Sequence, residues 1–487
     1  MVGEELTGTG SWRVWAPREA VAQSGAARAC LLWTISRVLG RSAAVQNFLP
    51  CERDQQFLLP PSLTDWLPED HLAWFVIDSV DQMDLSGFRA SYRADGWGRA
   101  AHDPAMMVSL MLYAYCVGER SSRRIERRCV EDVAFRVLVA NQRPDHSTIA
   151  RFRQRHTHAL TGVFVQVLRL CQQAGLVRLG VVALDGTKIA GSAALTANRT
   201  RDQIAAQVAA MLAEADAVDA AEDAADDGQD QTPAVLRGRA DRRRRLAEAK
   251  AQLDAEDAAA AAAQEHKLRQ RAQAEAAQAA QGRKLTGRKP KPVAAPTAER
   301  RRNTSDPDSR VMKSAKGWVQ GYNGQALVGA GQIILAAQAV NDPTDVGQFQ
   351  PMLQAGAANL ATVGVSDPIR AVVADAGYYS QANIIASGPE PFIATTNRRK
   401  RDLTPPRGRI PTSLSIMGRM ERKLRTKHGQ ALYRRRSQIV EPVFGQIKHV
   451  RGITRLLRRG LAAANSEWNL ICATHNLLKL WRAAPVH

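Results

Sequence analysis

Two short apolar runs stand out along the chain because each is followed at once by an aspartate. Residues 181–184 read Val-Val-Ala-Leu before Asp185, and residues 371–374 read Ala-Val-Val-Ala before Asp375. Short continuous apolar runs with glycines close by are typical of fully buried β-strands. We therefore predict that both aspartates lie where a strand leaves the core.

A helical pattern carries a third acidic residue, Glu441. Apolar residues recur beside it at positions i, i+3, i+4 and i+7, which predicts one buried helical stripe made of Val440, Val443, Phe444 and Ile447. Glu441, Lys448 and Arg455 repeat every seven residues, so we expect them to share another face of this helix. Pro442 disfavours a helical conformation at Glu441, so the helix either starts there or is kinked there.

The rest of the C-terminal half alternates between strand and helix patterns. Residues 324–340 predict two strands around a glycine-containing turn, and residues 345–360 predict a helix. A short helix at 380–386 and a strand at 391–395 follow, before a basic, proline-containing loop at 398–412. This order is typical of an α/β fold built on a mixed sheet.

The segment 65–178 is predicted to be helical. Pro104 precedes a strongly apolar stretch and suits the first turn of a helix. After two further short helices, a polar turn at 141–145 leads into a basic helix at 147–156. Such a helix pair resembles a helix-turn-helix, whose second helix can enter a major groove. DNA contacts are then expected from Arg151, Arg153 and Arg155, with a merely solvated basic face as the alternative.

Composition suggests how the chain is divided. Residues 1–44 lack periodicity and predict a poorly ordered extension, and translation beginning at Val45 is a sharper hypothesis. We assign 45–178 to an all-α N-terminal domain and 179–487 to the α/β domain. Within the latter, residues 200–302 are rich in alanine and charge and offer little apolar stripe for burial. They predict an inserted helical arm that ends in a basic tether.

The charge balance points to a polyanionic partner. The chain has 487 residues, a net charge of +20 and an isoelectric point near 10.2, a balance that most often indicates nucleic acid. The six cysteines form no CxxC pair, which favours reduced thiols in a cytoplasmic protein. No apolar run approaches the length of a membrane helix, and no GxGxxG or Walker pattern predicts a nucleotide cofactor.

The three acidic residues together suit metal-dependent phosphodiester chemistry. Two divalent ions about 3.5–4 Å apart can serve the attacking and leaving oxygens of a phosphodiester, and carboxylates are their natural ligands. A single aspartate after a buried strand is more often a turn former or helix cap. Three acids in this order within one α/β domain of a very basic chain favour the catalytic interpretation of Asp185, Asp375 and Glu441.

At these residues the chain resembles the DDE transposases of bacterial insertion sequences, in the broad IS-four and IS-five group. The motifs are Leu184-Asp-Gly-Thr-Lys188, Ala374-Asp-Ala-Gly-Tyr378 and the run from Ile439 to Lys448. The Tyr, Arg, Glu, Lys signature of the family is carried by Tyr433, Arg436, Glu441 and Lys448. Four residues separate Arg436 from Glu441 where the usual pattern has three. The resemblance extends from about residue 45 to the C-terminus and also includes Asp306-Pro-Asp308-Ser-Arg310 and Gly321-Tyr-Asn-Gly-Gln325.

The resemblance implies an RNase H-like mixed-sheet catalytic core, interrupted by the Ala-rich arm. It implies two Mg²⁺ ions, with Mn²⁺ as a substitute, held by the three carboxylates. Water would nick the end of the element, and the freed 3′-hydroxyl would then attack target DNA. Tyr433, Arg436, Lys448 and Arg455 would position phosphates. The N-terminal domain would bind the terminal inverted repeats, with a homodimer holding two ends of double-stranded DNA at the bacterial nucleoid.

Two alternatives stay open at the level of sequence. A metal-dependent nuclease would keep the fold but use only water as nucleophile. A catalytically silent DNA-binding regulator derived from such an element is the second, and the presence of all three carboxylates argues against it.

Overall fold

The computed structural model describes residues 62–93, 100–224, 239–284, 286–287, 292, 300–314, 317–395 and 404–483. The predicted extension at 1–44 and the proposed start at Val45 lie outside the described residues. All described residues belong to the unit that spans 62–487.

The N-terminal part is helical, as the periodicity predicts. After a 3₁₀ turn at Leu63–Trp66, its helices are α2 (Leu72–Asp81), α3 (Ser86–Arg89), α4 (Pro104–Cys116), α5 (Ser122–Glu131), α6 (Val133–Leu138), α7 (His146–Arg155) and α8 (Thr157–Gln173). Helix α4 starts as expected, with Pro104 in the first turn and the Asp103 carboxylate accepting from the Ala105 N–H at 2.5 Å. Every residue from Met107 to Cys116 is buried, so α4 is the centre of this helical layer.

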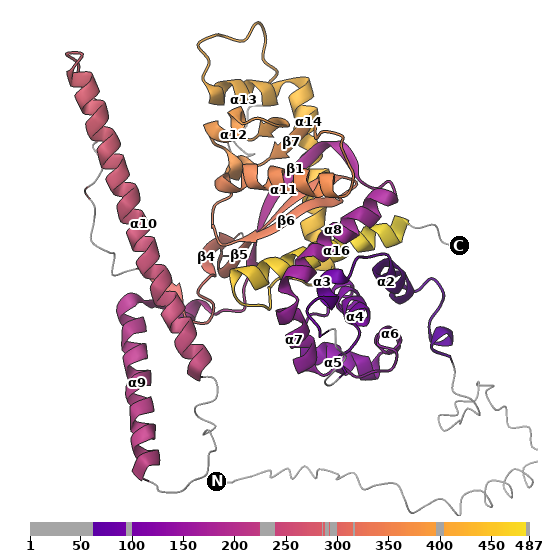
Figure 1. Ribbon diagram of the computed structural model, residues 1–487. Helices are drawn as coiled ribbons and strands as arrows, with labels where there is room; N and C mark the ends of the chain where they lie inside the picture. The colour runs from indigo at the N-terminus through magenta and orange to yellow at the C-terminus, as the bar shows by residue number, and fades with distance from the viewer. Residues whose placement is uncertain are drawn as a thin grey trace, which may run out of the picture. The chain divides into compact units, whose positions relative to one another are not determined.

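The C-terminal part is built on a mixed sheet (Figure 1). Its strands are β1 (Arg178–Ala190), β4 (Arg310–Ser314), β5 (Gly317–Ala330), β6 (Ile334–Val340), β7 (Ala371–Ala374) and β8 (Glu390–Ile393). The order is β4-β5-β1-β7-β8, with β6 also pairing with β5. Strand β1 runs antiparallel to β5 and parallel to β7, and β7 runs parallel to β8. The predicted α/β class with a mixed sheet is therefore confirmed.

Helices cover the sheet and connect its strands. Helix α11 (Phe349–Thr362) packs against β6 and β5, and the short α12 (Gln381–Ile385) precedes β8. Helices α13 (Ile416–Arg425) and α14 (Lys427–Ile439) are followed by α15 (Glu441–Gly445), a π-helical turn at Gln446–Val450 and the closing helix α16 (Leu461–Ala483).

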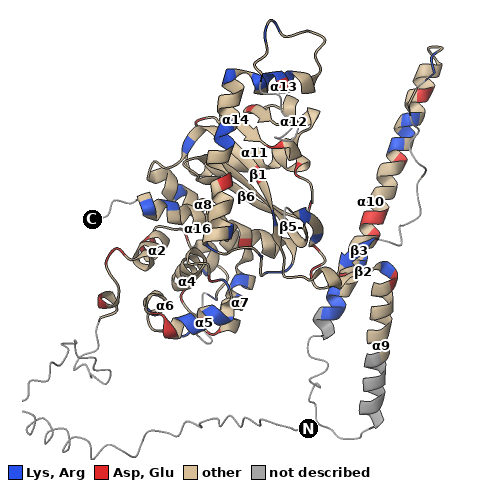
Figure 2. Cartoon of the chain, turned by 180° about the vertical axis from the view of Figure 1, so that it is seen from behind, with Lys and Arg blue, Asp and Glu red and all other residues tan. Residues whose placement is uncertain are grey.

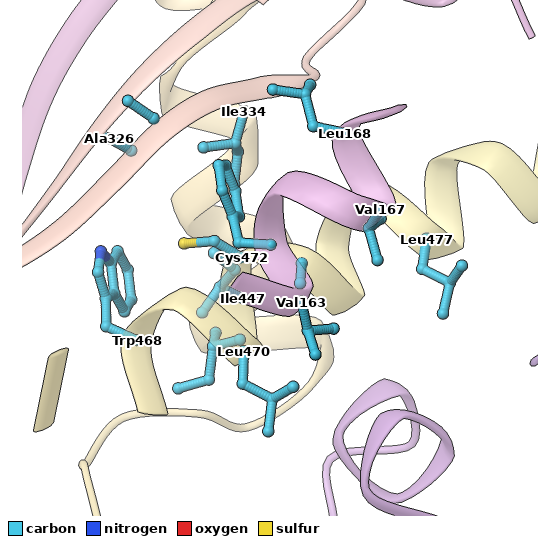
Figure 3. Close-up of a cluster of buried hydrophobic side chains, with 14 of the residues drawn as sticks. Val163, Val167, Leu168, Ala326, Ile334, Ile447, Trp468, Leu470, Cys472 and Leu477 are labelled. Carbon is cyan, nitrogen blue, oxygen red and sulfur yellow. The ribbon is translucent and has the colours of Figure 1, made fainter. Parts of the chain in front are cut away.

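Helix α16 joins the sheet to the helical layer. Its residues 466–477 are all buried, and it packs against α8, α4 and β6. Trp468 lies against β5, where the indole N–H donates to the Gln325 carbonyl at 3.0 Å. The approach requires Gly324, because a Cβ there would lie 2.9 Å from the Trp468 ring. Figure 3 shows side chains of α8, α16 and the sheet meeting in this core.

His475 of α16 has a structural role. Its Nε2–H donates to the Gln332 carbonyl at 2.9 Å, and burial together with Arg451 lowers its pKa to about 3. The folded state therefore binds fewer protons than the unfolded state between about pH 3 and pH 6.5, so the stability that His475 contributes is lost as the pH falls through this window.

This titration gives a testable prediction for His475→Gln, whose side-chain amide can still donate to Gln332. Between pH 6.5 and 4.5 the wild-type free energy of unfolding should fall by roughly 2–3 kcal/mol more than that of the variant. Urea unfolding at both pH values measures the difference. Equal pH dependence of the two proteins would contradict a buried, neutral His475.

The Ala-rich insertion is helical, as its composition predicts. Helices α9 (Arg201–Ala224) and α10 (Arg239–Ala279) lie in the chain between β2 (Asn198–Thr200) and β3 (Arg301–Asn303), which pair as a two-stranded sheet. Among the described side chains, the two helices share a small apolar cluster that contains Ile204, Leu246, Ala249 and Leu253. Beyond Leu253, α10 is held to the strands by charge, since Glu256 pairs with Arg302 and with Arg310.

The Asp306-Pro-Asp308-Ser-Arg310 motif ties the start of α16 to this region. Asp306 accepts from the Tyr322 hydroxyl and from the Gly460 N–H. Asp308 accepts from the Leu461 N–H at 2.8 Å and from the Gln252 side chain of α10 at 2.7 Å. The two aspartates thus satisfy N–H groups at the start of α16 that would otherwise lack partners.

Candidate active site

Asp185 and Asp375 lie next to each other on neighbouring parallel strands. Leu184 of β1 pairs with Ala374 of β7, so the residue that follows each of them is an aspartate. Strand β7 ends at Ala374, as predicted for Asp375. Strand β1 does not end at Asp185 but continues to Ala190, which corrects the prediction that Asp185 terminates a strand.

The reason for this difference is the partner strand. Asp185 pairs with Ala326, and the antiparallel ladder with β5 continues for five more residues past Asp185, to Ala190. The apolar run therefore marks the part of β1 that is covered on both faces, whereas hydrogen bonding sets the length of the strand.

Glu441 begins a new helix beside these strands. Helix α14 ends at Ile439, Val440 adopts a distorted helical conformation, and α15 starts at Glu441 with Pro442 in its first turn. Of the two alternatives predicted at Pro442, a helix start or a kink, the structure shows a helix that starts at Glu441. Helix α14 contacts both β1 and β7, which brings this junction to the carboxyl end of β7. Val440, Val443 and Ile447 are buried, as the stripe predicted.

Arg436 joins two of the three acids. Its Nη2 donates to Asp185 Oδ2 at 2.6 Å, and its Nη1 donates to Glu441 Oε1 at 3.1 Å. The Arg436 and Asp185 side chains are only 16% and 14% exposed, whereas Glu441 is 49% exposed. A charged fork held between two carboxylates is a strong, geometrically specific contact.

The site favours the binding of positive charge. Burial raises the pKa of Asp185 to about 7, Arg436 opposes this rise, and the neighbouring Asp375 adds to it. A charged Asp185 therefore needs a cation beside it. Arg436 supplies one, and a divalent ion would supply a larger charge.

Lys448 is fixed against β1 close to Asp185. Its Nζ donates to the Thr187 hydroxyl and to the Lys188 carbonyl, the latter at 2.9 Å. Tyr433 lies one turn before Arg436 on α14 and is half-buried against the core. The helix that contains Lys448 stops at Val450, so Arg455 does not share its face with Glu441. Arg455 instead forms a β-bridge with Ala190, and its place on the predicted helix was wrong.

Asp345 is an acid of this region that the sequence analysis did not single out. Its Oδ1 accepts from Lys188 Nζ at 3.0 Å, Asn323 Nδ2 at 2.6 Å and Gln325 Nε2 at 2.9 Å. The Tyr378 hydroxyl in turn donates to Gln325 Oε1. The network links the motifs around Asp185, Tyr322 and Asp375. Asp345 follows no buried strand, so no apolar run marked it.

The donor set fits a hard divalent cation. All candidate ligands are oxygens, and the carbonyl oxygen of the fully buried Asn323 has no hydrogen-bond partner among the described residues. Within that part of the chain, no three His, Cys, Asp or Glu side chains are already close enough to hold one ion. Metal binding by Asp185 and Glu441 together therefore requires the Arg436 guanidinium to leave its position between them.

The basic helix α7 exposes two of its three candidate arginines. Arg151 and Arg155 are exposed, and Arg155 also lies over the Tyr92 ring at 4.8 Å. Arg153 is buried and donates to the Arg120 carbonyl at 2.8 Å and to the Ser122 hydroxyl. Arg153 therefore links α7 to the start of α5 by hydrogen bonds. The prediction that Arg153 contacts DNA is corrected accordingly.

Helix α5, which packs against α7, adds basic residues that the sequence analysis did not assign. Arg123 and Arg127 are exposed one helical turn apart, and Figure 2 shows Lys and Arg gathered along α5. The i, i+4 spacing of Arg123 and Arg127 in the sequence indicates that they lie on the same side of the helix, and this pattern could have identified them.

Comparison with known families gives two matches. Residues 61–155 match the family described as transposase domain (DUF772), and residues 407–481 match the family described as transposase DDE domain. The first range covers α2 to α7, and the second covers α14, Glu441 and most of α16. No curated protein and no solved structure matches the chain. No helix in the described ranges is long and apolar enough to cross a membrane.

Proposed function

Because the chain belongs to the DDE transposases of insertion elements, we propose that Asp185, Asp375 and Glu441 are its catalytic carboxylates. The chain is thus a DNA transposase, an enzyme of a family that uses divalent metal ions. The specific proposal is that the three carboxylates hold two Mg²⁺ ions, which Mn²⁺ can replace, within an RNase H-like core.

One observation carries this proposal. Asp185 and Asp375 follow paired residues on adjacent parallel strands, and Arg436 connects Asp185 to Glu441. Three acids separated by long stretches of chain, including the whole arm, thus converge at one edge of a mixed sheet. Convergence of this kind is expected of a catalytic constellation and not of isolated helix caps.

The residues would act in two successive reactions at the DNA. Bound divalent ions would supply charge neutralisation and a more acidic water. In the first reaction, water attacks the phosphorus at the element end, the P–O3′ bond breaks, and a 3′-hydroxyl and a 5′-phosphate result. In the second, this 3′-hydroxyl attacks a target phosphodiester, and the displaced target oxygen leaves as a new 3′-hydroxyl. No covalent bond to the protein is needed.

Arg436, Tyr433 and Lys448 would position the phosphates. Arg436 already faces Asp185 and Glu441 with a planar fork that suits a phosphate equally well. We propose that it turns from the carboxylates to the scissile phosphate when the ions bind. Lys448, held by the Thr187 hydroxyl, would stay near the phosphate that flanks the cut. These contacts would fix the position of the DNA without recognising its base sequence.

The N-terminal helices would bind the terminal inverted repeats of double-stranded DNA, with a homodimer holding two ends. Arg151 and Arg155 of α7 and Arg123 and Arg127 of α5 are the exposed basic residues that support this.

The double variant Arg151→Ala/Arg155→Ala should bind DNA more weakly at every sequence. The slope of log K against log salt should decrease by about 2, because each lost phosphate contact removes about 1. Fluorescence anisotropy over a salt series measures this, with Arg169→Ala on α8 as the control. Arg153→Ala should instead lower stability, since it leaves buried polar partners unpaired. An unchanged salt slope in the double variant would remove α7 from the interface.

The strand-transfer reaction tests the proposed function against its alternatives. Pre-cleaved DNA from the end of the element is mixed with supercoiled plasmid, Mg²⁺ and the full chain. Joined products in which two ends enter one plasmid are expected. Nicking without joining would favour a nuclease, and DNA binding without either reaction would favour a silent regulator.

A further inference from the structure

Asp345 lies at the same edge of the sheet as the proposed catalytic acids, yet the mechanism above does not use it. It directly precedes the 3₁₀ turn Val346–Gln348 that leads into α11. Its Oδ1 is fully engaged by the three donors of Lys188, Asn323 and Gln325. Since Lys188 pairs with Asn323 in the β1–β5 ladder, all three donors lie on one face of the sheet.

The second oxygen of Asp345 faces the turn that carries Asp375. A Cβ added to Gly377 would lie 3.1 Å from Asp345 Oδ2 and 3.0 Å from Asp375 Oδ1. Both carboxylate oxygens thus border the space that the absent side chain of Gly377 leaves open. Asp375 Oδ1 accepts from the Gly377 N–H at 2.9 Å, whereas Asp345 Oδ2 has no hydrogen bond within the described part of the chain.

Asn323 provides an independent indication of a ligand. The residue is fully buried, and its Nδ2 donates both to Asp345 Oδ1 and to the Asp342 carbonyl, which fixes the orientation of the amide. Its Oδ1 has no partner among the described residues and lies 2.9 Å from a Cβ added to Gly186. A buried carbonyl without a partner costs about 1–3 kcal/mol, so such an atom in a native site suggests an ion or an ordered water.

We propose that Asp345 is a fourth carboxylate of the metal site, which binds through Oδ2 a divalent ion that Asp375 also holds. Asn323 Oδ1, which lies beside Gly186 on the Oδ1 side of Asp345, would accept a hydrogen bond from a water of the ion. The set consists only of hard oxygens and leaves places for water, which suits Mg²⁺ or Mn²⁺. Lys188 neutralises Oδ1 and leaves Oδ2 for the ion. This inference rests on the proposed function, because it extends the same site.

Mn²⁺ binding to the DNA-free, full-length protein tests the inference without relying on activity. Asp345→Asn keeps an oxygen for the three donors but loses the charge, so the fold is retained. Asp342→Asn is the matched control, since Asp342 lies in the same loop and, within the described part of the chain, its carboxylate accepts from Thr344 alone. Electron paramagnetic resonance of free Mn²⁺ should show at least about tenfold weaker binding by Asp345→Asn. The control should bind as the wild type does.

Equal binding by Asp345→Asn and wild type would overturn the inference. Asp185→Asn separates this failure from failure of the proposed function. If Asp185→Asn loses Mn²⁺ binding while Asp345→Asn does not, the triad stands and Asp345 is only the counter-ion of Lys188. If neither variant affects binding, the triad itself is wrong.

A cysteine variant gives a second readout that a positioning role alone would not change. Asp345→Cys places a soft thiolate at the proposed ligand, so Cd²⁺ should produce a thiolate charge-transfer band in the ultraviolet above the wild-type background. The band should weaken when Asp375→Asn is added, because both residues hold the same ion. Absence of the band, or a band that is unaffected by Asp375→Asn, would contradict the proposal.

Discussion

Glu441→Gln is expected to abolish both cleavage of the element end and strand transfer. The side chain is 49% exposed, and glutamine has the same shape, so the substitution removes a negative charge without disturbing packing. Loss of a metal-binding carboxylate should lower the rate by at least about 10³-fold, or about 4 kcal/mol of transition-state stabilisation. DNA binding by the N-terminal helices should be unchanged.

The experiment compares Mg²⁺-dependent cleavage of DNA that carries the flanking inverted repeat. Glu390→Gln is a matched control, because Glu390 is also about half exposed (55%) and paired with a cation, Lys423, at 2.7 Å. Cleavage by Glu390→Gln should equal that of the wild type. Activity of Glu441→Gln within tenfold of the wild type would mean that Glu441 holds no essential ion.

Arg436→Ala is expected to have the second largest effect, on stability as well as on catalysis. Removal of the guanidinium leaves Asp185 buried beside Asp375 without its cationic partner. Breaking a buried ion pair from one side costs about 3–5 kcal/mol when the remaining group stays charged. The pKa of Asp185, which burial already raises to about 7, would rise further, because Arg436 opposes that rise.

The sign of the pH dependence follows from this raised pKa. The folded state binds a proton at Asp185 that the unfolded state has already released, so the contribution of Asp185 to stability is greatest at low pH and decreases as the pH rises through the folded pKa. In EDTA at pH 8, the unfolding temperature of Arg436→Ala should be well below that of the wild type. The difference between the two unfolding temperatures should be smaller at pH 5.5. Arg435→Ala, an exposed neighbour on α14, is the control. Identical unfolding of both variants at pH 8 would show that Arg436 does not neutralise Asp185.

Much of the fold could be predicted from apolar patterns. The apolar run before Asp375 correctly predicted strand β7 and its end. The apolar stripe from Val440 to Ile447 correctly predicted which face is buried around Glu441. These features depend on burial, which a single sequence encodes directly. The continuation of β1 past Asp185 depends instead on hydrogen bonds to β5, and no local pattern reports them.

The roles of individual charged residues were harder to predict. Arg153 lies between Arg151 and Arg155 in the sequence, yet it is buried against α5 because its side chain points towards the carbonyl of Arg120. Arg455 keeps the heptad spacing, but the helix ends at Val450 before reaching it. The described side-chain partners of Asp345 lie 20 or more positions away in the chain, so these contacts form only once β1 and β5 are paired.

The proposed mechanism requires Asp185, Asp375 and Glu441 to hold divalent ions jointly at a phosphodiester. Anomalous diffraction from crystals of the protein bound to its terminal DNA, grown with Mn²⁺, tests it most directly. We expect Mn²⁺ peaks contacted by the oxygens of all three carboxylates, with Arg436 turned onto a phosphate. Mn²⁺ bound elsewhere, or Arg436 still joining Asp185 to Glu441 in a DNA complex that contains Mn²⁺, would contradict it.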